Sequence, residues 1–267
     1  APYTPSYEAP ASFIAVPVFD EAKKVGVLAM QMPVGRINAV MQASEGMGET
    51  GETYLVVTVQ LMRSQSRLID KRYKDSRLDE RVTLAEIDWS FNPKVPRAGC
   101  FELNTLKFIS EGANALLIGK PGTGKSHVAK AVAYHAVQQG LKVAYVEADS
   151  DFARYALVDA RERELMLQRF LAADLLVLDD LFLAKRVSET AAELLQTLVH
   201  QRHRRRASVL VTSNRVIRDW GTYLGDMTMA STILDRLMHR SRMLEFEGKS
   251  YRLKEAAQRL ATKTQAD

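Results

Sequence analysis

Eight residues, Gly119-Lys120-Pro121-Gly122-Thr123-Gly124-Lys125-Ser126, most constrain what this chain can fold into. They fit the pattern of a glycine, any four residues, and then Gly-Lys followed by Ser or Thr. The apolar run Ala115–Ile118 precedes them, and residues 127–137 follow with apolar side chains at helical spacing. A buried strand, a glycine loop and a helix, in this order, are the context that the pattern requires. The alternative is a glycine turn that caps an ordinary helix.

The chemistry of such a loop is that of a phosphate site. Its glycines let consecutive backbone N–H groups turn inward around a triphosphate, and the start of the helix adds a positive field. We expect Lys125 to reach the β- and γ-phosphates and the Ser126 hydroxyl to ligate Mg²⁺. The loop therefore predicts a site for a nucleoside triphosphate and its magnesium.

A second apolar run ends in two carboxylates. Leu175–Leu178 has the length of a buried strand, and Asp179 and Asp180 follow it directly. Asp179 is predicted to hold the magnesium opposite Ser126, while Asp180 orients and deprotonates the attacking water. The alternative is that the two acids end a strand in solvent. With them, the phosphate loop predicts hydrolysis as well as binding.

Two further polar residues are candidates for the same reaction. Asn214 follows another strand, where its amide would hold the lytic water or touch the γ-phosphate, although asparagine is also common in turns. Arg236 lies on a predicted helix and is a candidate arginine finger for a neighbouring subunit, which would make hydrolysis depend on assembly. Alternatively, Arg236 is a surface arginine paired with Asp235 or Glu245.

Strands and helices alternate from about residue 100 onward. Near-continuous apolar strands separated by helices predict a parallel sheet covered on both faces, with the phosphate loop at the carboxyl end of its first strand. This predicts an α/β P-loop domain with a five-stranded parallel sheet. The other strands are expected at Lys142–Glu147, Leu175–Asp179, Ser208–Ser213 and Met243–Phe246, and helices at Ser188–Arg206 and Ala230–Arg240.

Composition narrows the class of protein. Hydrophobic residues make up 46% and charged residues 26% of the chain, which is typical of a soluble globular protein. No apolar run approaches the ~18 residues of a membrane span, so we expect no membrane association and a cytoplasmic location. A single cysteine, Cys100, excludes an internal disulfide and indicates no metal cluster. The strand that ends at Asn214 also lacks the Asn-Lys-x-Asp motif of switch GTPases, and no acceptor pocket or arginine-rich lid of a small-molecule kinase is identifiable.

Residues from about 67 to 260 resemble the IstB-like ATPases, which are transposition helper proteins of the AAA+ superfamily related to the DnaC helicase loaders. The matching segments are Leu84–Trp89, Gly119–His127, Tyr145–Asp149, Leu175–Leu181, Val211–Asn214 and Ser231–Arg240. The phosphate loop and the paired acids are the most specific of these.

The resemblance implies an ATP site at Gly119–His127, magnesium binding and hydrolysis at Asp179 and Asp180, a sensor role for Asn214 and a trans-acting arginine at Arg236. It also implies ATP-dependent homo-oligomers on DNA that help a partner transposase engage its target. The small helical lid of many AAA+ proteins is reduced or absent in this group, with which the short tail after residue 246 is consistent. Two rivals stay open, namely a helicase loader in DNA replication and an inactive fusion product that only binds nucleotide.

Two places are candidates for DNA contact. Four arginines, Arg202, Arg204, Arg205 and Arg206, end a predicted helix and would contact phosphates, although cations also suit a solvated helix end. Phe152 and Arg154 follow the second strand, where initiator and loader relatives carry DNA-contacting helices. Phe152 would stack on bases or pack in the core. Nothing here reads base edges, so we expect largely sequence-independent binding. The positive net charge of the chain also favours a polyanionic partner such as DNA. This charge lies in the nucleotide-binding part, because residues 1–66 carry only four Lys or Arg against six Asp or Glu.

The first 66 residues differ in character from the rest. Their segments Phe13–Val18, Gly26–Pro33, Ile37–Met41 and Gly48–Val56 resemble a fragment of a cache-type chemoreceptor sensor domain. We interpret them as a vestigial α+β piece of a fused reading frame, followed by a charged helix and linker over residues 67–99 and the ATPase domain over residues 100–267. The elements expected in the fragment are strands at Phe13–Phe19 and Lys24–Met30, a helix at Arg36–Gln42, a glycine-rich loop at Gly46–Gly51 and a strand at Tyr54–Val59.

Overall fold

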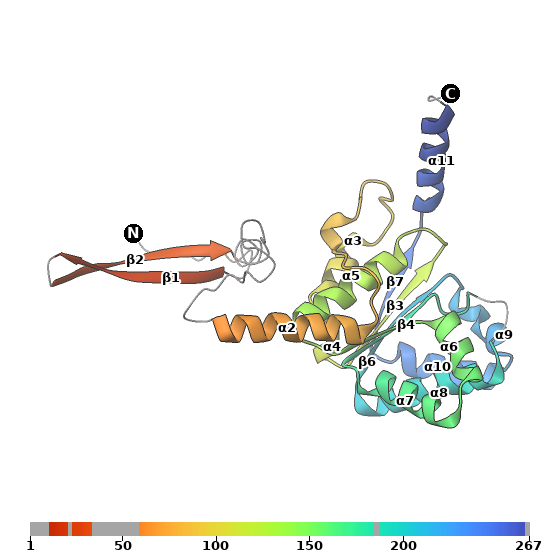
Figure 1. Ribbon diagram of the computed structural model, residues 1–267. Coiled ribbons are helices and arrows are strands. Elements are labelled where there is room, and N and C mark those ends of the chain that lie inside the picture. Colours follow the sequence, from red (N-terminus) through yellow and green to blue (C-terminus); the bar gives the residue numbers. More distant parts are fainter. Residues whose placement is uncertain (1–10, 21–22, 34–58, 184–186, 265–267) are drawn as a thin grey trace. The chain divides into compact units, whose positions relative to one another are not determined.

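The computed structural model describes residues 11–20, 23–33, 59–183 and 187–264 (Figure 1). The chain divides into two compact units, Ala1–Ser64 and Gln65–Asp267. In the first unit, β1 (Ala11–Asp20) pairs antiparallel with β2 (Lys23–Pro33), with an irregularity between Val18 and Phe19. This confirms the two strands predicted there. The predicted helix, glycine loop and third strand lie outside the described residues, except for Val59, which begins a helix.

The second unit is built on a five-stranded sheet of order β4-β5-β6-β3-β7 in which all neighbours are parallel. This confirms the predicted fold. The chain passes from β3 to the edge strand β4 after the phosphate loop, and it crosses β3 again between β6 and β7. The carboxyl ends of all strands lie at one edge, which is where ligands bind in open α/β sheets. The strands are β3 (Asn114–Gly119), β4 (Val143–Glu147), β5 (Leu175–Asp179), β6 (Ser208–Ser213) and β7 (Ser241–Phe246).

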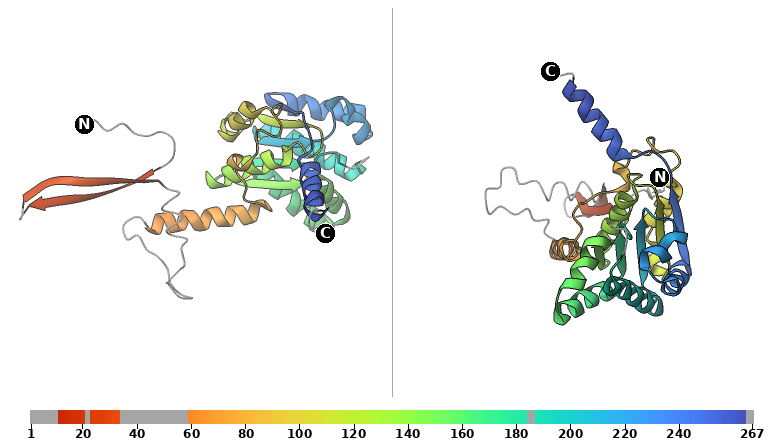
Figure 2. Two further views of the ribbon diagram at one scale, coloured as in Figure 1. Left: turned by 90° about the horizontal axis from the view of Figure 1, so that it is seen from above. Right: turned by 90° about the vertical axis from the view of Figure 1, so that its right-hand side faces the viewer.

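Helices cover both faces of this sheet (Figure 2). One face is covered by the helix that follows the phosphate loop and by shorter helices that precede the sheet, namely α3 (Arg97–Asn104), α4 (Lys107–Ser110) and α5 (Lys125–Gln138). The opposite face is covered by α6 (Ala148–Leu157), α7 (Ala160–Ala172), α8 (Glu189–Arg205), the 3₁₀ helix η2 (Ile217–Asp219), α9 (Trp220–Leu224) and α10 (Met227–Met238).

Strand residues alternate between the two layers. Leu116 and Ile118 of β3 contribute to the cluster under α6–α10, whereas Ala115 and Leu117 contribute to the cluster under α3–α5. Successive side chains of a strand point to opposite faces, so a strand that is covered on both faces must be apolar throughout. Burial of both sets of side chains is the main stabilising contribution to such a three-layer domain.

Polar caps fix where several helices begin. The Ser188 hydroxyl accepts the backbone N–H of Ala191 at 3.3 Å and starts α8 at the residue after it. The Asp226 carboxylate accepts the N–H groups of Thr228 and Met229, which starts α10 before the predicted Ala230. Each such cap stabilises its helix by about 1 kcal/mol.

The end of α2 (Val59–Ser76) packs on the domain, where the Tyr73 ring meets Tyr134 of α5 edge-on at 5.9 Å. The chain continues through the 3₁₀ helix η1 (Leu84–Glu86). The predicted linker residue Asn92 is buried, and its amide exchanges two hydrogen bonds with the Lys249 backbone, at 2.8 and 2.9 Å. Beyond β7, the tail forms α11 (Tyr251–Thr264), which projects from the domain in Figure 1.

Candidate functional site

The phosphate loop connects β3 to α5 as predicted. The backbone of Gly119, Gly122 and Gly124 has positive φ angles of 151°, 74° and 100°. A Cβ atom on Gly119 would lie 2.1 Å from the carbonyl oxygen of Phe246 in β7, so only glycine fits between the two strands. The loop brings the N-terminus of α5 to the carboxyl edge of the sheet, where its free N–H groups favour an anion.

Lys125, the first residue of α5, is 3% exposed. Its ammonium group donates to the carbonyl oxygens of Gly119 at 2.8 Å and Lys120 at 2.7 Å. Burial lowers the pKa of Lys125 to about 8, against the opposing attraction of Asp180 and Asp179. A buried cation that is only partly compensated favours a nearby anion, which a triphosphate would supply.

Asp179 ends β5 and is 5% exposed. One of its oxygens, Oδ2, accepts the Tyr145 hydroxyl at 2.6 Å, and the other, Oδ1, accepts the Thr212 hydroxyl at 2.5 Å. Each carboxylate oxygen retains a further lone pair, so the group can still ligate a metal ion or a metal-bound water. Hydroxyl and carboxylate oxygens, such as those of Ser126 and Asp179, are the kind of donor that Mg²⁺ prefers.

Asp180 turns away from the strand direction, with a positive φ of 52°. Its backbone N–H donates to Thr212 Oγ1 at 2.8 Å, and its Oδ1 accepts from the Asn214 amide at 3.3 Å. Burial, followed by the charge of Asp179, raises the pKa of Asp180. A carboxylate with a raised pKa is a better proton acceptor, which suits the predicted role of this residue.

Asn214 lies in the loop after β6, beside Asp180. The next residue, Arg215, donates to the carbonyl oxygens of Phe182 at 3.2 Å and Leu183 at 3.4 Å, and its guanidinium lies 4.7 Å from the centre of the Tyr223 ring. These contacts tie the loop after β6 to the loop after β5. The two predicted reaction residues are thus held together by their neighbours.

One cleft of about 600 Å³ collects these groups. The phosphate loop, Asp180 and Asn214 line it together with the rings of Trp89, Phe91 and Tyr251. Polar groups that suit phosphates and aromatic rings that suit a flat base are what a nucleotide needs. The other lining residues are Glu80, Glu86, Ile87, Asp88, Asn92, Val95, His127, Val128, Lys130, Phe246 and Arg252.

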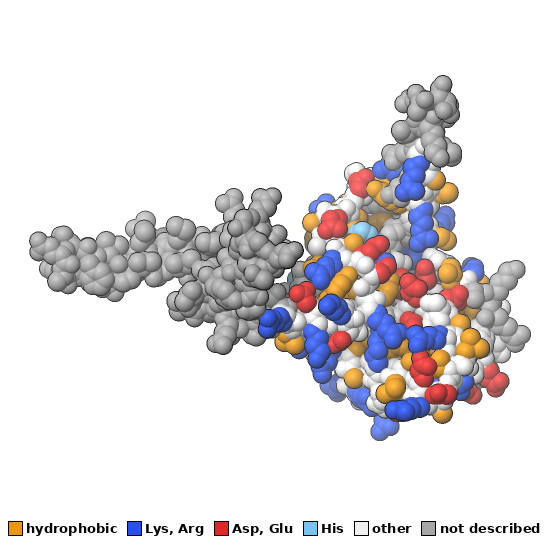
Figure 3. Space-filling view, viewed as in Figure 1, with side chains coloured by type: hydrophobic (Ala, Val, Ile, Leu, Met, Phe, Trp, Pro, Cys, Tyr) orange, Lys and Arg blue, Asp and Glu red, His pale blue; other side chains and the backbone are white. Residues whose placement is uncertain are grey.

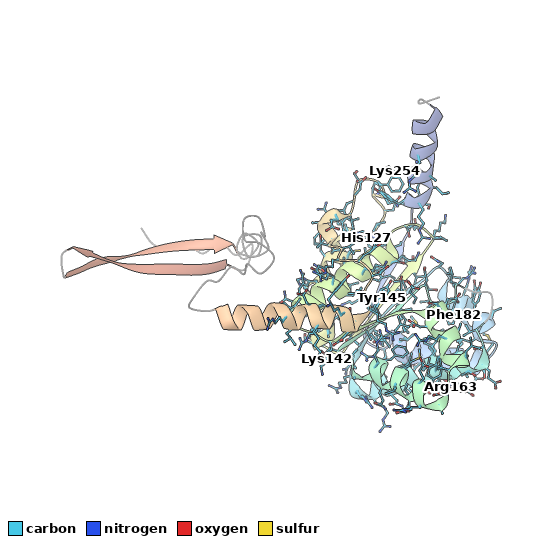
Figure 4. All side chains as sticks on the ribbon, viewed as in Figure 1. His127, Lys142, Tyr145, Arg163, Phe182 and Lys254 are labelled. Atoms are coloured by element: carbon cyan, nitrogen blue, oxygen red, sulfur yellow. The ribbon has the colours of Figure 1, made fainter. Side chains whose placement is uncertain are left out.

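The tail contributes residues to the cleft that sequence reasoning missed. The backbone N–H of Tyr251 donates to Gly122 O in the phosphate loop at 2.8 Å. Lys254 contacts Asp88 at 3.4 Å, and its ammonium lies 4.4 Å from the centre of the Phe91 ring. Arg252, between them, lines the cleft. Lys254 and His127 are marked in Figure 4, where they come from α11 and α5. The basic residues of the tail were the signal that could have suggested a role.

Arg236 of α10 is half-buried and donates to Thr232 O at 3.0 Å within its own helix. It is not among the residues that line the cleft of its own chain. Its predicted role at a neighbouring site stays a prediction.

Two of the DNA-contact candidates are buried. Phe152 is 3% exposed and packs in the core, which is the second of the two alternatives predicted for it, and burial of Arg202 corrects its prediction as a DNA contact. Arg202 is 0% exposed, and its guanidinium donates to four carbonyl oxygens that end α7 and begin β6, those of Phe170, Ala173, Asp174 and Ser208. A helix-end arginine was mistaken for a surface group because three of the four carbonyl oxygens around it lie 28 to 32 residues away in the chain.

Arg204, Arg205 and Arg206 are exposed at the end of α8, where Arg206 adopts a left-handed backbone. Arg154 of α6 is also exposed and pairs with Glu162. Lys and Arg side chains are spread over the face of the domain seen in Figure 3. These four arginines are available to a polyanion.

Within the ranges that the structure describes, no helix is long and apolar enough to cross a membrane. Nor do those residues contain a group of three or more His, Cys, Asp or Glu placed to hold a metal ion.

The sequence matches the family of IstB-like ATP-binding proteins over residues 36–259. It is 36% identical over 190 residues, 71% of each chain, to a protein of Pseudomonas aeruginosa described as an ATP-binding protein of insertion sequence IS21. A Geobacillus stearothermophilus protein, described as an ATP-binding protein of insertion sequence IS5376, is 31% identical over 80% of this chain and 84% of its own. The family match begins at residue 36, whereas the IstB-like resemblance was predicted to begin at about residue 67.

Solved structures support the fold. DnaI superposes with a TM-score of 0.53 at 18% identity, covering 67% of this chain and 92% of its own. Replication initiator DnaA bound to AMPPCP and single-stranded DNA gives a TM-score of 0.52 at 21% identity, over 70% of this chain and 56% of its own. The Gln65–Asp267 unit therefore shares the fold of these structures.

Proposed function

We propose that this chain, which belongs to the IstB-like ATP-binding protein family, hydrolyses ATP on DNA and assists a transposase in DNA transposition. ATP binding follows from the family. Hydrolysis is supported by the meeting of Lys125, Asp180 and Asn214 at one cleft. Asp179, which precedes Asp180, is hydrogen-bonded to the same Thr212 hydroxyl as the Asp180 backbone. This convergence is the observation that carries the proposal.

Different residues of the cleft bind the base, the phosphates and the metal ion. The aromatic region around Trp89 takes the base, and the loop Gly119–His127 takes the phosphates through its backbone N–H groups. Lys125 leaves its carbonyl partners to reach the β- and γ-phosphates. In the bound state, Ser126 and Asp179 hold Mg²⁺, which neutralises charge on the β- and γ-phosphates.

Asp180 accepts the proton of the attacking water, and burial, by raising the pKa of its carboxyl, strengthens it as a base. Asn214 orients that water or contacts the γ-phosphate, since its amide already lies 3.3 Å from Asp180. Arg236 acts on the site of a neighbouring copy in a homo-oligomer, because it is absent from the cleft of its own chain. An arginine supplied in this way accelerates transfer by about 10³–10⁵.

DNA binding is proposed for the exposed arginines at the end of α8, with Arg154 as a second contact. Each phosphate neutralised steepens the dependence of log K on log salt by about 0.9. No feature of these contacts reads base edges, so binding is largely independent of sequence and a partner transposase supplies any target preference. The relatives named for insertion sequences favour a transposase as the partner. The cytoplasmic location stays a prediction.

The test is ATP turnover measured with and without DNA over a series of protein concentrations. Turnover per subunit should rise with concentration and with DNA, and Lys125→Ala should abolish it. Lys107→Ala is a matched control, because Lys107 is an exposed lysine of α4 that pairs with Glu111 at 3.6 Å. Absence of turnover from the unaltered chain at every concentration, with DNA present, contradicts the proposal and favours the inactive fusion product.

A helicase loader would contain the same ATPase core, and the likeness to DnaI is one of fold alone. The two functions are separated by co-purification. A transposase encoded beside this chain should be retained by it in the presence of ATP, whereas retention of the replicative helicase alone would favour the loader.

A further inference from the structure

Asp179 is held from both sides by hydroxyl groups. The Tyr145 hydroxyl donates to Oδ2 at 2.6 Å and the Thr212 hydroxyl donates to Oδ1 at 2.5 Å. All three side chains are buried, at 3% exposure or less for Tyr145 and Thr212. We call Tyr145 and Thr212 the hydroxyl clamp.

The order of the strands creates this clamp. β5 lies between β4, which carries Tyr145, and β6, which carries Thr212. Tyr145 is paired with Val177, two positions before Asp179 on the same face of β5. A tyrosine is long enough to lean along the strand and reach the next residue of that face. Thr212 needs no such reach, because Val211 before it is paired with Leu178. Figure 4 marks Tyr145 at the sheet.

The clamp restricts the carboxylate without occupying all of it. An ionised carboxylate has about four acceptor positions, of which the two hydroxyls take one on each oxygen. A tyrosine hydroxyl is protonated at neutral pH, so it acts as a donor to the carboxylate. With both oxygens held, the carboxylate keeps one orientation and presents its remaining lone pairs in fixed directions.

Thr212 has a second contact that Tyr145 lacks. Its oxygen accepts the backbone N–H of Asp180 at 2.8 Å, at the residue with the positive φ of 52°. One hydroxyl thus fixes both the side chain of Asp179 and the backbone that carries Asp180.

We propose that Tyr145 and Thr212 are positioning residues that set the magnesium affinity of Asp179, and that Thr212 also places Asp180 for hydrolysis. The inference rests on the proposed ATP site. Groups that orient a metal ligand through hydrogen bonds change metal affinity or activity about 10–100-fold when they are removed. The clamp was absent from the sequence-based site because both residues lie inside apolar strands.

The test is the Mg²⁺ concentration needed for half-maximal binding of a fluorescent, non-hydrolysable ATP analogue to the full chain. Tyr145→Phe should raise this concentration about tenfold while leaving binding in EDTA unchanged. Tyr134→Phe is the matched control, because it also removes a tyrosine hydroxyl. Tyr134 lies on α5, and its ring packs against Tyr73. Thr212→Val should raise the concentration similarly and also lower kcat, whereas Thr212→Ser, which keeps the hydroxyl, should restore both.

The magnesium dependence of Tyr145→Phe decides the inference. If it equals that of the unaltered chain and of Tyr134→Phe, the clamp has no positioning role and the inference is overturned. Thermal unfolding of each variant shows whether it is folded. If Thr212→Val is unfolded, the role of Thr212 is tested with Thr212→Ser instead. If the unaltered chain itself binds the analogue without any magnesium dependence, the proposed function fails instead.

Discussion

The charge of a single residue, Lys125, should make nucleotide binding depend on pH. Burial lowers its pKa to about 8 in the free protein, and a bound triphosphate favours the protonated form. Affinity for a fluorescent ATP analogue should therefore fall as the pH rises through 8, by at most about tenfold per pH unit. Because the folded pKa lies below the unfolded one, the free protein should gain stability over the same rise in pH, up to the unfolded pKa.

Lys125→Arg is the control for this prediction, since an arginine keeps its charge through this range. Whatever affinity it retains should be nearly independent of pH. An unaltered chain whose affinity is the same on both sides of pH 8 would show that the ammonium charge of Lys125 does not contribute to binding.

Arg202 and Arg204, two residues apart on α8, should behave oppositely. Arg202 is fully buried among carbonyl oxygens, so Arg202→Ala should destabilise the fold by about 3 kcal/mol or more. Arg204→Ala should leave the unfolding temperature nearly unchanged, weaken DNA binding and reduce the salt slope by about one. Thermal unfolding and DNA titrations at several salt concentrations measure the two effects. Equal unfolding temperatures for both variants would contradict the structural role of Arg202.

The difference between these arginines explains what single residues could and could not reveal in the sequence. Lys125, Asp179 and Asp180 were identified because their spacing from glycines and apolar strands is local. The structural roles of Tyr145 and Arg202 were not identified, because their hydrogen-bond partners come from other segments of the chain. The arginine run at the end of α8 looks uniform in sequence, yet the fold buries its first member.

At the scale of elements, the first turn of α11 should support nucleotide binding. It contacts the phosphate loop through Tyr251 and the Asp88–Phe91 segment through Lys254. Deleting residues 250–267 should therefore weaken binding of the ATP analogue about tenfold, since lost hydrogen bonds and ring contacts are each worth about 1 kcal/mol.

The matched control deletes residues 260–267 only, which keeps Tyr251, Arg252 and Lys254. It should bind as the full chain does, and both truncated chains should unfold near the temperature of the full chain. Unchanged affinity after the longer deletion would exclude α11 from the site.

Most elements could be predicted because their signals are periodic and local. All five strands of the sheet and helices α8 and α10 were found in this way. The contact of the tail with the cleft could not be, since Asn92 meets Lys249 across 157 residues. A proline-containing segment reads as a linker until the chain that covers it is known.

At the scale of the whole molecule, hydrolysis should require more than one copy. Arg236→Ala should bind ATP normally and lose most of its turnover, as should Asp180→Ala. Mixing the two variants should restore part of the activity, because an intact Arg236 from one copy can then serve an intact Asp180 of another. Turnover of the mixture, compared with each variant alone at the same total concentration, measures this. Failure of the mixture to exceed its components would remove the trans role of Arg236.

The organisation of the chain is the level at which the sequence revealed least. The family match begins at residue 36, and the hairpin β1–β2 precedes it. The chemoreceptor resemblance of residues 1–66 stays a prediction, as do the domain limits drawn from it. Weak similarity over a short segment does not determine a domain boundary. The ATPase domain is easier to delimit, because a P-loop sheet has a fixed order of elements.

The central claim is that the phosphate loop and the paired acids form one site that binds and hydrolyses ATP. Asp180→Asn tests it most directly, because it keeps the shape of the side chain and removes the proton acceptor. The ATP analogue should bind with unchanged affinity, while DNA-stimulated turnover falls by about 10²–10⁴. Turnover equal to that of the unaltered chain would contradict the account.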